Sequence, residues 1–444
     1  MEEKRQPIKS TGCTESKFSI AGNSSLYLIE EAGTFSWLKS LGCIFLFVFA
    51  CGAMYMTGEG QLKTLGMILT GYFILLMMGP NLGRIFPMPA EIVMFVLWGA
   101  WSAATGILIA ESKFFFWNGG LSQVLQTLIL VLAVYGITRL NKQKALYAVM
   151  CATLVGGIIQ AVAARSETIS LGGIDSGERA LGLSENSNTL GFLMLWALIA
   201  IMLLLKRNSG VVRKTVLIFG GLIVPLFIYS LLGTGSRKTL LAFLFLFFAW
   251  IVYAMAPRYR AKAILWTSLF LLVSIMLAGP LIDFLEHNTT AGQRMLSKMS
   301  VSSNLVEAES KRFYLYKEGF DFFIQNPIAG FGLNQFKIHS TTGLYSHSNY
   351  MEPLANTGLV GFVLYQGIFF LPLIRAYRLS KMPFEQGVVY HFRMIVIAGS
   401  IIVLLGFGTV WTQSVNVMPL LALFSAYTYS AELSLRTATG RRMA

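Results

Sequence analysis

Apolar stretches of helix-spanning length recur along almost the whole chain and constrain its fold more than any other feature. About twelve can be counted, near residues 36–57, 62–79, 90–110, 121–138, 145–164, 188–205, 215–232, 239–256, 263–280, 353–374, 393–411 and 415–431. A helix of roughly 20 apolar residues spans the hydrocarbon core of a bilayer. Charged residues make up only 13% of the 444 residues, too few to cover several soluble cores. The sequence therefore predicts an all-α polytopic membrane protein with about twelve transmembrane helices, and it excludes a soluble enzyme, a disordered protein and a secreted disulfide scaffold.

The basic residues predict the orientation of these helices. With the N-terminus in the cytoplasm, the cytoplasmic segments hold nearly twice as many Lys and Arg as the external ones, as the positive-inside rule requires. The net charge of +14 follows from this bias and does not indicate nucleic-acid binding. We therefore expect both termini inside. The predicted organisation is a cytoplasmic tail (1–35), transmembrane helices 1–9 (36–280), an external loop subdomain (281–352), transmembrane helices 10–12 (353–431) and a cytoplasmic tail (432–444).

The external loop 281–352 is long enough to form a small subdomain of its own. Aromatic residues recur in it at helical spacing, namely Phe313, Tyr316, Phe320 and Phe323. Asn304 is a candidate N-cap for this helix, and Asn326-Pro327 would end it. We expect an amphipathic helix that lies on the membrane surface.

Cysteines and histidines show no metal-ligand spacing. Cys13 lies in the polar N-terminal tail and the other three cysteines fall in apolar runs. His287, His339 and His347 lie in the external loop, whereas His391 is predicted to be cytoplasmic. Their spacing fits no zinc signature, and Gly233–Thr239 lacks the spacing of a nucleotide-binding loop. We expect no metal and no other cofactor.

Three external arginines are candidate phosphate ligands. Orientation rules disfavour basic residues on this face, yet Arg179, Arg237 and Arg312 are retained there. A guanidinium group binds phosphate oxygens bidentately, which suits a lipid-linked phosphate or pyrophosphate at the membrane surface. Ordinary contact with lipid headgroups is the alternative for each arginine.

The segment Tyr345–Gly361 holds the candidate base. His347 lies where a predicted span emerges, and an imidazole with a pKa near neutrality can take a proton from a sugar hydroxyl. Glu352 follows shortly after; it either orients the imidazole or is an interfacial carboxylate. A plain loop histidine is the alternative for His347.

Taken in order, these segments resemble the O-antigen ligase and O-antigen polymerase superfamily of bacterial inner-membrane glycosyltransferases. The resemblance rests on Arg179–Asn188, Gly235-Ser-Arg237 and the block Arg312–Gly361. Within that block, Asn326-Pro-Ile-Ala-Gly-Phe-Gly332 and His347-Ser-Asn-Tyr350 precede Gly358-x-x-Gly361. Ser348 departs from the common His-Asn pairing of the family.

The resemblance implies a metal-independent transfer of a glycan from undecaprenyl pyrophosphate on the periplasmic face of the inner membrane. Arg179, Arg237 and Arg312 would hold the pyrophosphate, and His347 would be the general base. The acceptor would be the lipid A core in a ligase or a second lipid-linked glycan in a polymerase. Tyr345–Tyr350 looks somewhat more polymerase-like, and transfer to protein is a third possibility within the family.

A polysaccharide transporter or lipid flippase is the alternative from another class. It would need charged residues or broken helices at mid-membrane. The predicted spans are almost free of charge, which favours chemistry at the outer surface.

Overall fold

The computed structural model describes residues 36–55, 66, 68–69, 71–72, 85–170, 183, 187–207, 211–234, 236–254, 265, 302–411, 414 and 416–443. This part of the chain is helical and contains no β-strand, which confirms the predicted all-α class. The chain divides into Met1–Leu38, described only from residue 36, and Lys39–Ala444, which contains every feature discussed below.

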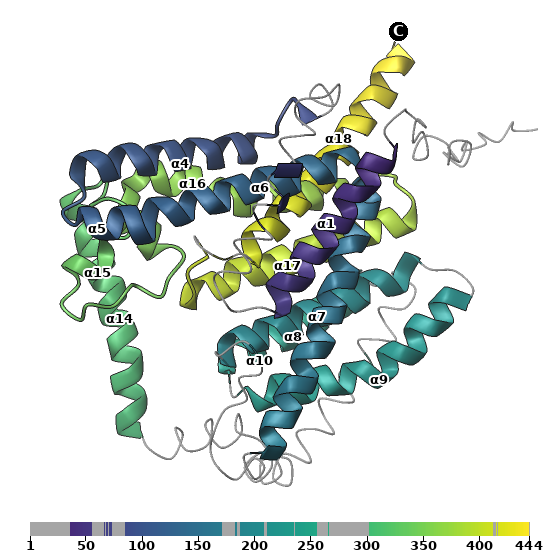
Figure 1. Ribbon diagram of the computed structural model, residues 1–444, viewed down its shortest axis with the longest axis horizontal. Coiled ribbons are helices and arrows are strands. Elements are labelled where there is room, and N and C mark those ends of the chain that lie inside the picture. The colour runs from purple at the N-terminus through teal and green to yellow at the C-terminus, as the bar shows by residue number, and fades with distance from the viewer. Residues whose placement is uncertain are drawn as a thin grey trace, which may run out of the picture. The chain divides into compact units, whose positions relative to one another are not determined.

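Helices account for most of the described residues (Figure 1). They are α1 (Ser36–Tyr55), α4 (Ala90–Ile109), α5 (Lys113–Phe115), α6 (Ser122–Leu140), α7 (Lys142–Ser170), α8 (Ser187–Arg207), α9 (Val211–Gly233), α10 (Arg237–Ala249), α14 (Ser302–Gln325), α15 (Phe336–His339), α16 (Met351–Leu379), α17 (Gln386–Leu405) and α18 (Val417–Met443). Two π-helical segments, Phe116–Leu121 and Trp250–Ala254, precede α6 and extend α10. A 3₁₀ turn, Gly406–Gly408, follows α17.

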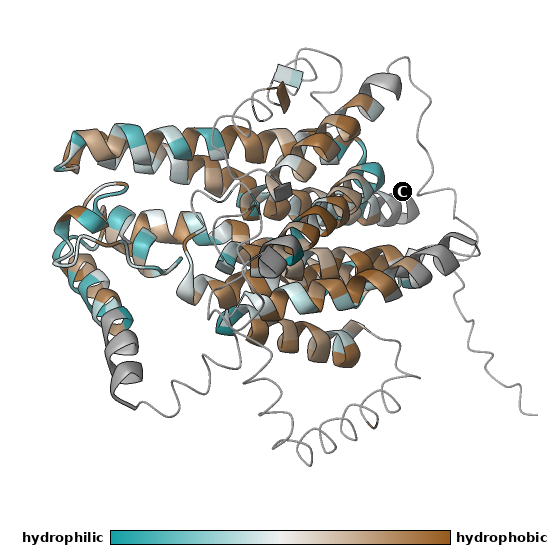
Figure 2. Ribbon diagram, turned by 60° about the horizontal axis from the view of Figure 1, so that its bottom comes forward, coloured by the Kyte–Doolittle hydropathy of each residue, from teal (hydrophilic) through white to brown (hydrophobic). Residues whose placement is uncertain are grey.

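Seven of the described helical segments are long and apolar enough to cross a membrane. They are Ala90–Ile109, Lys113–Leu140, Lys142–Arg165, Ser187–Leu204, Arg237–Ala254, Met351–Leu379 and Gln386–Gly408. Shorter apolar helices occupy Ser40–Ala53 and Phe219–Gly233. Figure 2 shows that hydrophobic residues make up most of these helices. The predicted spans 62–79 and 263–280 lie almost entirely outside the described residues. Twelve spans and the orientation of the termini therefore stay predictions.

The last predicted span, 415–431, falls in α18, which is longer and is packed against α6 and α16. Ser425, Thr428 and Ser430 are buried on this helix. The hydroxyls of Thr428 and Ser430 donate to the carbonyls of Phe424 and Ala426, at 2.8 and 2.7 Å. These polar residues lower the hydropathy of α18, so its place in the interior depends on packing more than on apolar composition.

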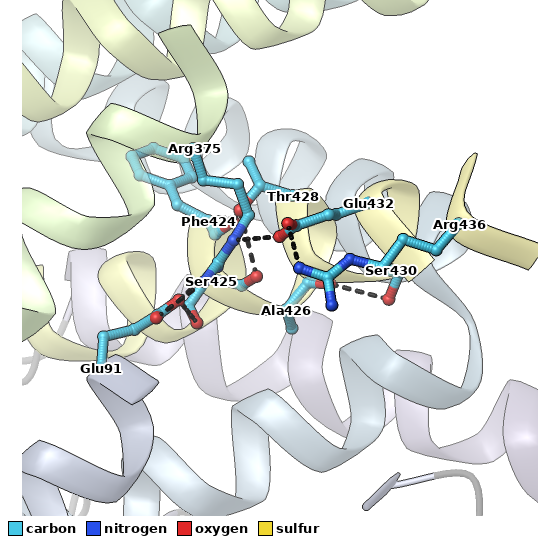
Figure 3. A network of polar contacts seen from close by, with 9 residues as sticks. All are labelled: Glu91, Arg375, Phe424, Ser425, Ala426, Thr428, Ser430, Glu432 and Arg436. Carbon is cyan, nitrogen blue, oxygen red and sulfur yellow. Dashed lines mark hydrogen bonds and ion pairs between the residues drawn. The ribbon is translucent and has the colours of Figure 1, made fainter. Parts of the chain in front are cut away.

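A buried ion-pair network joins α4, α16 and α18 (Figure 3). The guanidinium group of Arg375 binds both carboxylate oxygens of Glu91, one of them at 2.8 Å, and donates to Glu432 at 2.9 Å. Ser425 donates to Glu91 at 2.7 Å. The prediction of almost charge-free spans is wrong here: Glu91 is fully buried in α4, and Arg375 lies in α16 and not in a loop. Pairing offsets part of the cost of burying these charges.

The helix predicted within residues 281–352 is confirmed as α14, which ends at Gln325 just before Asn326-Pro327. Its position on an external membrane surface stays a prediction. It begins at Ser302, so Asn304 lies inside the helix and is not its N-cap. Two residues of the aromatic stripe, Phe313 and Phe320, are exposed. Leu315 is buried instead, in a cluster with Phe336, Ala355 and Phe322.

Helix α16 is broken near its start, at Gly358, where φ is 63° and ψ is −170°. The break frees backbone groups that other segments satisfy. The amides of Phe331 and Gly332 donate to the carbonyls of Ala355 and Asn356 at 3.0 and 2.8 Å, and the amide of Leu359 donates to Pro327 at 2.8 Å. The indole of Trp101 donates to the Thr357 carbonyl at 2.9 Å. The segment 326–332 is thereby fixed against the first turns of α16.

Substitution of Gly358 by alanine is expected to destabilise the protein. A Cβ atom there would lie 2.2 Å from the Ile328 carbonyl oxygen, and the positive φ adds strain. We expect a loss of about 3 kcal/mol, measured as a lower midpoint of thermal unfolding in detergent. Gly343 is the matched control, because its φ is 66° but a Cβ atom there would meet no neighbouring atom within 4 Å. Gly343→Ala should lose only about 1 kcal/mol; equal losses would contradict a role for the close approach at Gly358.

Candidate active site

His347 lies in a tight loop immediately before α16, in the left-handed backbone conformation with φ 57°. Two serines hold this loop. The amide of Ser348 donates to the hydroxyl of Ser346 at 3.2 Å, and the Ser348 hydroxyl accepts the amides of Tyr350 and Met351 at 3.2 and 3.3 Å. A non-glycine residue in this conformation is strained and persists only where its surroundings hold it, often at a functional site.

Asn349 anchors the same loop to the helices behind it. Its side chain is buried, and its carbonyl oxygen Oδ1 accepts the Tyr365 hydroxyl at 2.7 Å and the Trp411 amide at 3.0 Å. Its own amide donates to the Gly406 carbonyl at 2.8 Å. The position of His347 is therefore fixed from both α16 and the segment that follows α17.

Glu352 is buried in the first turn of α16, and its carboxylate faces the loop. One oxygen accepts the Ser346 amide at 2.7 Å, and the other accepts the side-chain amide of Asn356 at 3.2 Å. These contacts run to the backbone beside His347. The carboxylate therefore acts on the imidazole through the loop that carries it.

The imidazole of His347 is half-buried, and its ring centroid lies 4.0 Å from that of Tyr345. Burial and the positive charges of Arg312 and Lys238 lower the pKa of His347 below its ordinary value of 6.5. Both effects penalise the charged imidazolium. At neutral pH the imidazole is therefore unprotonated and can accept a proton.

The structure places the three candidate arginines differently. Arg179 lies outside the described residues. Arg237 is exposed at the first position of α10, and Arg312 is exposed on α14. Of these, Arg312 acts electrostatically on His347. One turn further along α14, the Tyr316 hydroxyl donates to the Phe407 carbonyl, which ties this helix to the segment after α17.

Lys238 is a site residue that the sequence analysis did not single out. It follows Arg237 in α10, and its ammonium group donates to the Gly408 carbonyl at 2.8 Å and to the Thr409 hydroxyl at 2.9 Å. It also lies 5.5 Å from the centroid of the Phe192 ring. No local motif marks this residue, because its partners are 170 residues away in the chain.

A cavity of about 500 Å³ opens beside the His347 loop. Polar lining residues come from several helices and loops, namely Asn188, Thr189, Lys238, Asn334, Lys337, Tyr345, Glu352, Asn356, Thr357 and Thr409. Trp98 and Phe192 provide an apolar wall. The hydroxyl of Ser236 donates to Asn188 at 2.9 Å, so the first two motif segments of the sequence also meet here. A cavity with hydrogen-bonding groups, two ammonium groups and aromatic side chains can bind a polar, negatively charged ligand.

The other described histidines have structural surroundings. The ring of His339 packs against Phe331, with centroids 4.4 Å apart. His391 is buried in α17, with Nδ1 3.0 Å from the Tyr427 hydroxyl. Within the part of the chain that the structure describes, no group of three or more His, Cys, Asp or Glu side chains could hold a metal ion.

The described fold and cavity define an all-α protein with several helices of membrane-spanning length and a candidate base beside a cationic cavity. Residues 222–366 match the family model for O-antigen ligase. The match contains Arg237, Arg312, His347 and Glu352, so the resemblance to the O-antigen ligase superfamily is confirmed for this segment. A search of curated proteins gives no match to the chain.

Proposed function

We propose that the protein is a glycosyltransferase of the O-antigen ligase and polymerase type. It transfers a glycan from undecaprenyl pyrophosphate to an acceptor hydroxyl on the periplasmic face of the bacterial inner membrane. The observation that carries this proposal is the half-buried imidazole of His347, held in a fixed loop near the positive charges of Arg312 and Lys238. The family match over residues 222–366 supports it.

Each residue of the site has a role in this reaction. The acceptor oxygen attacks the anomeric carbon of the donor sugar while its proton passes to His347. The bond from that carbon to the pyrophosphate oxygen breaks, and the pyrophosphate leaves with the bonding electrons. Arg179, Arg237 and Arg312 bind the pyrophosphate and stabilise its developing charge. Glu352 positions the His347 loop through the Ser346 amide.

The alternative function, a transporter or flippase, draws no support from the buried charges. Arg375 is bonded to both Glu91 and Glu432, so these charges neutralise one another within the helix packing. A transport pathway requires charged groups that face a substrate or an ion, or helices broken at mid-membrane. The break in α16 at Gly358 lies near the start of the helix, and its backbone groups are bonded to the segment 326–332.

Transfer by the purified full-length protein tests the proposed function. We expect detergent-solubilised protein to move a glycan from undecaprenyl pyrophosphate onto an acceptor, and to do so in EDTA. Lack of transfer to both a lipid A-core acceptor and a second lipid-linked glycan would contradict the proposal. Activity lost in EDTA and restored by magnesium would contradict the metal-independent reaction.

The glycan profile of a deletion strain distinguishes the two acceptors. Accumulation of unligated lipid-linked polymer is expected for a missing ligase. Single repeats attached to the acceptor are expected for a missing polymerase.

Replacement of Arg312 by lysine is expected to impair transfer although the charge is kept. A lysine offers a point charge, whereas the guanidinium group binds two phosphate oxygens in a fixed geometry. We expect a loss of about 2–3 kcal/mol in transition-state stabilisation, or roughly 30- to 150-fold in kcat/KM. Arg378→Lys is the matched control on the exposed face of α16 and should be nearly silent. Equal activity of the two variants would reduce Arg312 to a headgroup contact.

A further inference from the structure

The residues Gly406–Trp411 lie between α17 and α18, and three of them, Gly408, Thr409 and Val410, line the cavity. We call them the 406–411 segment. Three consecutive carbonyls are held by three different parts of the protein. Gly406 accepts the Asn349 amide, Phe407 accepts the Tyr316 hydroxyl, and Gly408 accepts the Lys238 ammonium group. The segment therefore connects the His347 loop, α14 and α10.

Lys238 makes the contact from α10 with a single side chain. Its ammonium group donates to a carbonyl and to a hydroxyl of the 406–411 segment, at 2.8 and 2.9 Å. Charge-assisted hydrogen bonds of this kind are about twice as strong as neutral ones. The aliphatic part of the side chain also packs at the segment, since a Cβ atom at Gly408 would lie 3.8 Å from Lys238 Cδ.

We propose that Lys238 is a positioning residue. It holds the 406–411 segment against the His347 loop and so fixes the position of His347 relative to this side of the cavity. The proposal rests on the proposed function for the role of the base. It follows from the chain of contacts: Lys238 holds Gly408, and the same segment binds Asn349 through Gly406 and Trp411. Asn349 lies two residues after His347.

The charge of Lys238 also acts directly on the imidazole. Burial, then Arg312 from α14 and Lys238 from α10, lower the pKa of His347. The ring of Tyr345 packs against the imidazole at a tilt of 42°, and the side chain of Glu352 accepts the Ser346 amide from α16. Removal of Lys238 is therefore expected to raise the pKa of His347, because one of the two cations that lower it is lost.

Two measurements that need no substrate test this proposal on the full-length protein in detergent. The first is hydrogen exchange of the 406–411 segment, which should become roughly 10-fold faster in Lys238→Met. The second is the pH dependence of carbethoxylation at His347 by diethyl pyrocarbonate, a reagent that reacts with the unprotonated imidazole. The pH midpoint of this reaction should be higher in Lys238→Met than in the wild type. Lys238→Arg keeps the charge and the donors and should restore both. Lys317→Met, which removes an exposed lysine of α14, is the control and should change neither.

Activity gives the third measurement. Lys238→Met is expected to lose roughly 10- to 100-fold in transfer at neutral pH, with partial recovery at higher pH, and Lys238→Arg to stay near wild type. The positioning role would be overturned if Lys238→Met left unchanged the hydrogen-exchange rate of the 406–411 segment or the pH midpoint of carbethoxylation at His347.

Lys238→Gln is the second variant if Lys238→Met does not fold, because it keeps a hydrogen-bond donor without the charge. The pH midpoint of carbethoxylation at His347 must rise in this variant as well. Failure of the proposed function would appear as absent transfer in the wild type, and the two substrate-free measurements would be unaffected.

Discussion

Replacement of His347 by alanine is expected to reduce glycan transfer by roughly 10²- to 10⁴-fold, the usual contribution of a positioned general base. The imidazole is half-buried and unprotonated at neutral pH, and its loop is fixed by Ser346, Ser348 and Asn349. His347→Gln keeps hydrogen-bonding capacity but no base, so it should fail as well. Binding of the lipid-linked donor should persist in both variants, because the proposed ligands of the pyrophosphate are the arginines and not His347. Transfer rate and donor binding measured on the same preparations check this separation.

The controls for this prediction are a second histidine and the pH profile. His287→Ala, at a residue with no assigned role, should retain transfer. In the wild type the acidic limb of the rate profile should fall below pH 6.5, because the pKa of His347 is lowered and the base is lost only when it is protonated. Normal expression of His347→Ala with most of its transfer retained would remove the general-base role, and His339 in the same loop would become the next candidate.

Replacement of Arg375 by methionine is expected to destabilise the helix packing by about 3–5 kcal/mol, the usual cost of removing one partner of a buried ion pair. The carboxylates of Glu91 and Glu432 would lose their shared cation, and Glu91 is fully buried. A large drop in the midpoint of thermal unfolding in detergent should result. The double variant Glu91→Leu with Arg375→Met should be less harmful than Arg375→Met alone, because it removes the buried Glu91 carboxylate, and the partly exposed Glu432 keeps its ion pair with Arg436.

Arg436 is the internal control for the network. It pairs with Glu432 from an exposed position on α18 (Figure 3), so Arg436→Met should cost at most about 1 kcal/mol. If Arg375→Met is no worse than Arg436→Met, the buried network contributes little to stability.

Much of the fold could be predicted from the sequence, because bilayer thickness sets both the length and the composition of a spanning helix. The predicted spans 90–110 and 188–205 correspond closely to α4 and α8. The break in α16 could not be predicted in the same way. The sequence around Gly358 is that of an ordinary helix, and only the tertiary fold shows that the segment 326–332 lies against this glycine. The contact between α14 and α16 could not be predicted either, because Leu315 and the small Gly319 meet Phe336, Ala355 and Met351 only in the tertiary fold.

The residues of the candidate site that lie close together in the sequence could be predicted, whereas those brought together only by the tertiary fold could not. His347 and Glu352 lie in one short block, and their proximity follows from it. Lys238 could not be found from its neighbours, since the preference for guanidinium groups at phosphate sites favoured Arg237 beside it. Its role depends on Gly408 and Thr409, which only the tertiary fold brings to it.

The contacts that shape the His347 loop run largely through main-chain amides and carbonyls, together with Glu352 and Asn349. By contrast, Thr189, Leu333 and Val410 face the cavity with side chains outside that framework. Substitutions at these three positions can therefore change the shape of the cavity while the imidazole of His347 keeps its position. A scaffold built in this way can diversify its choice of saccharide through a few substitutions, and those positions are where an altered-specificity library should begin.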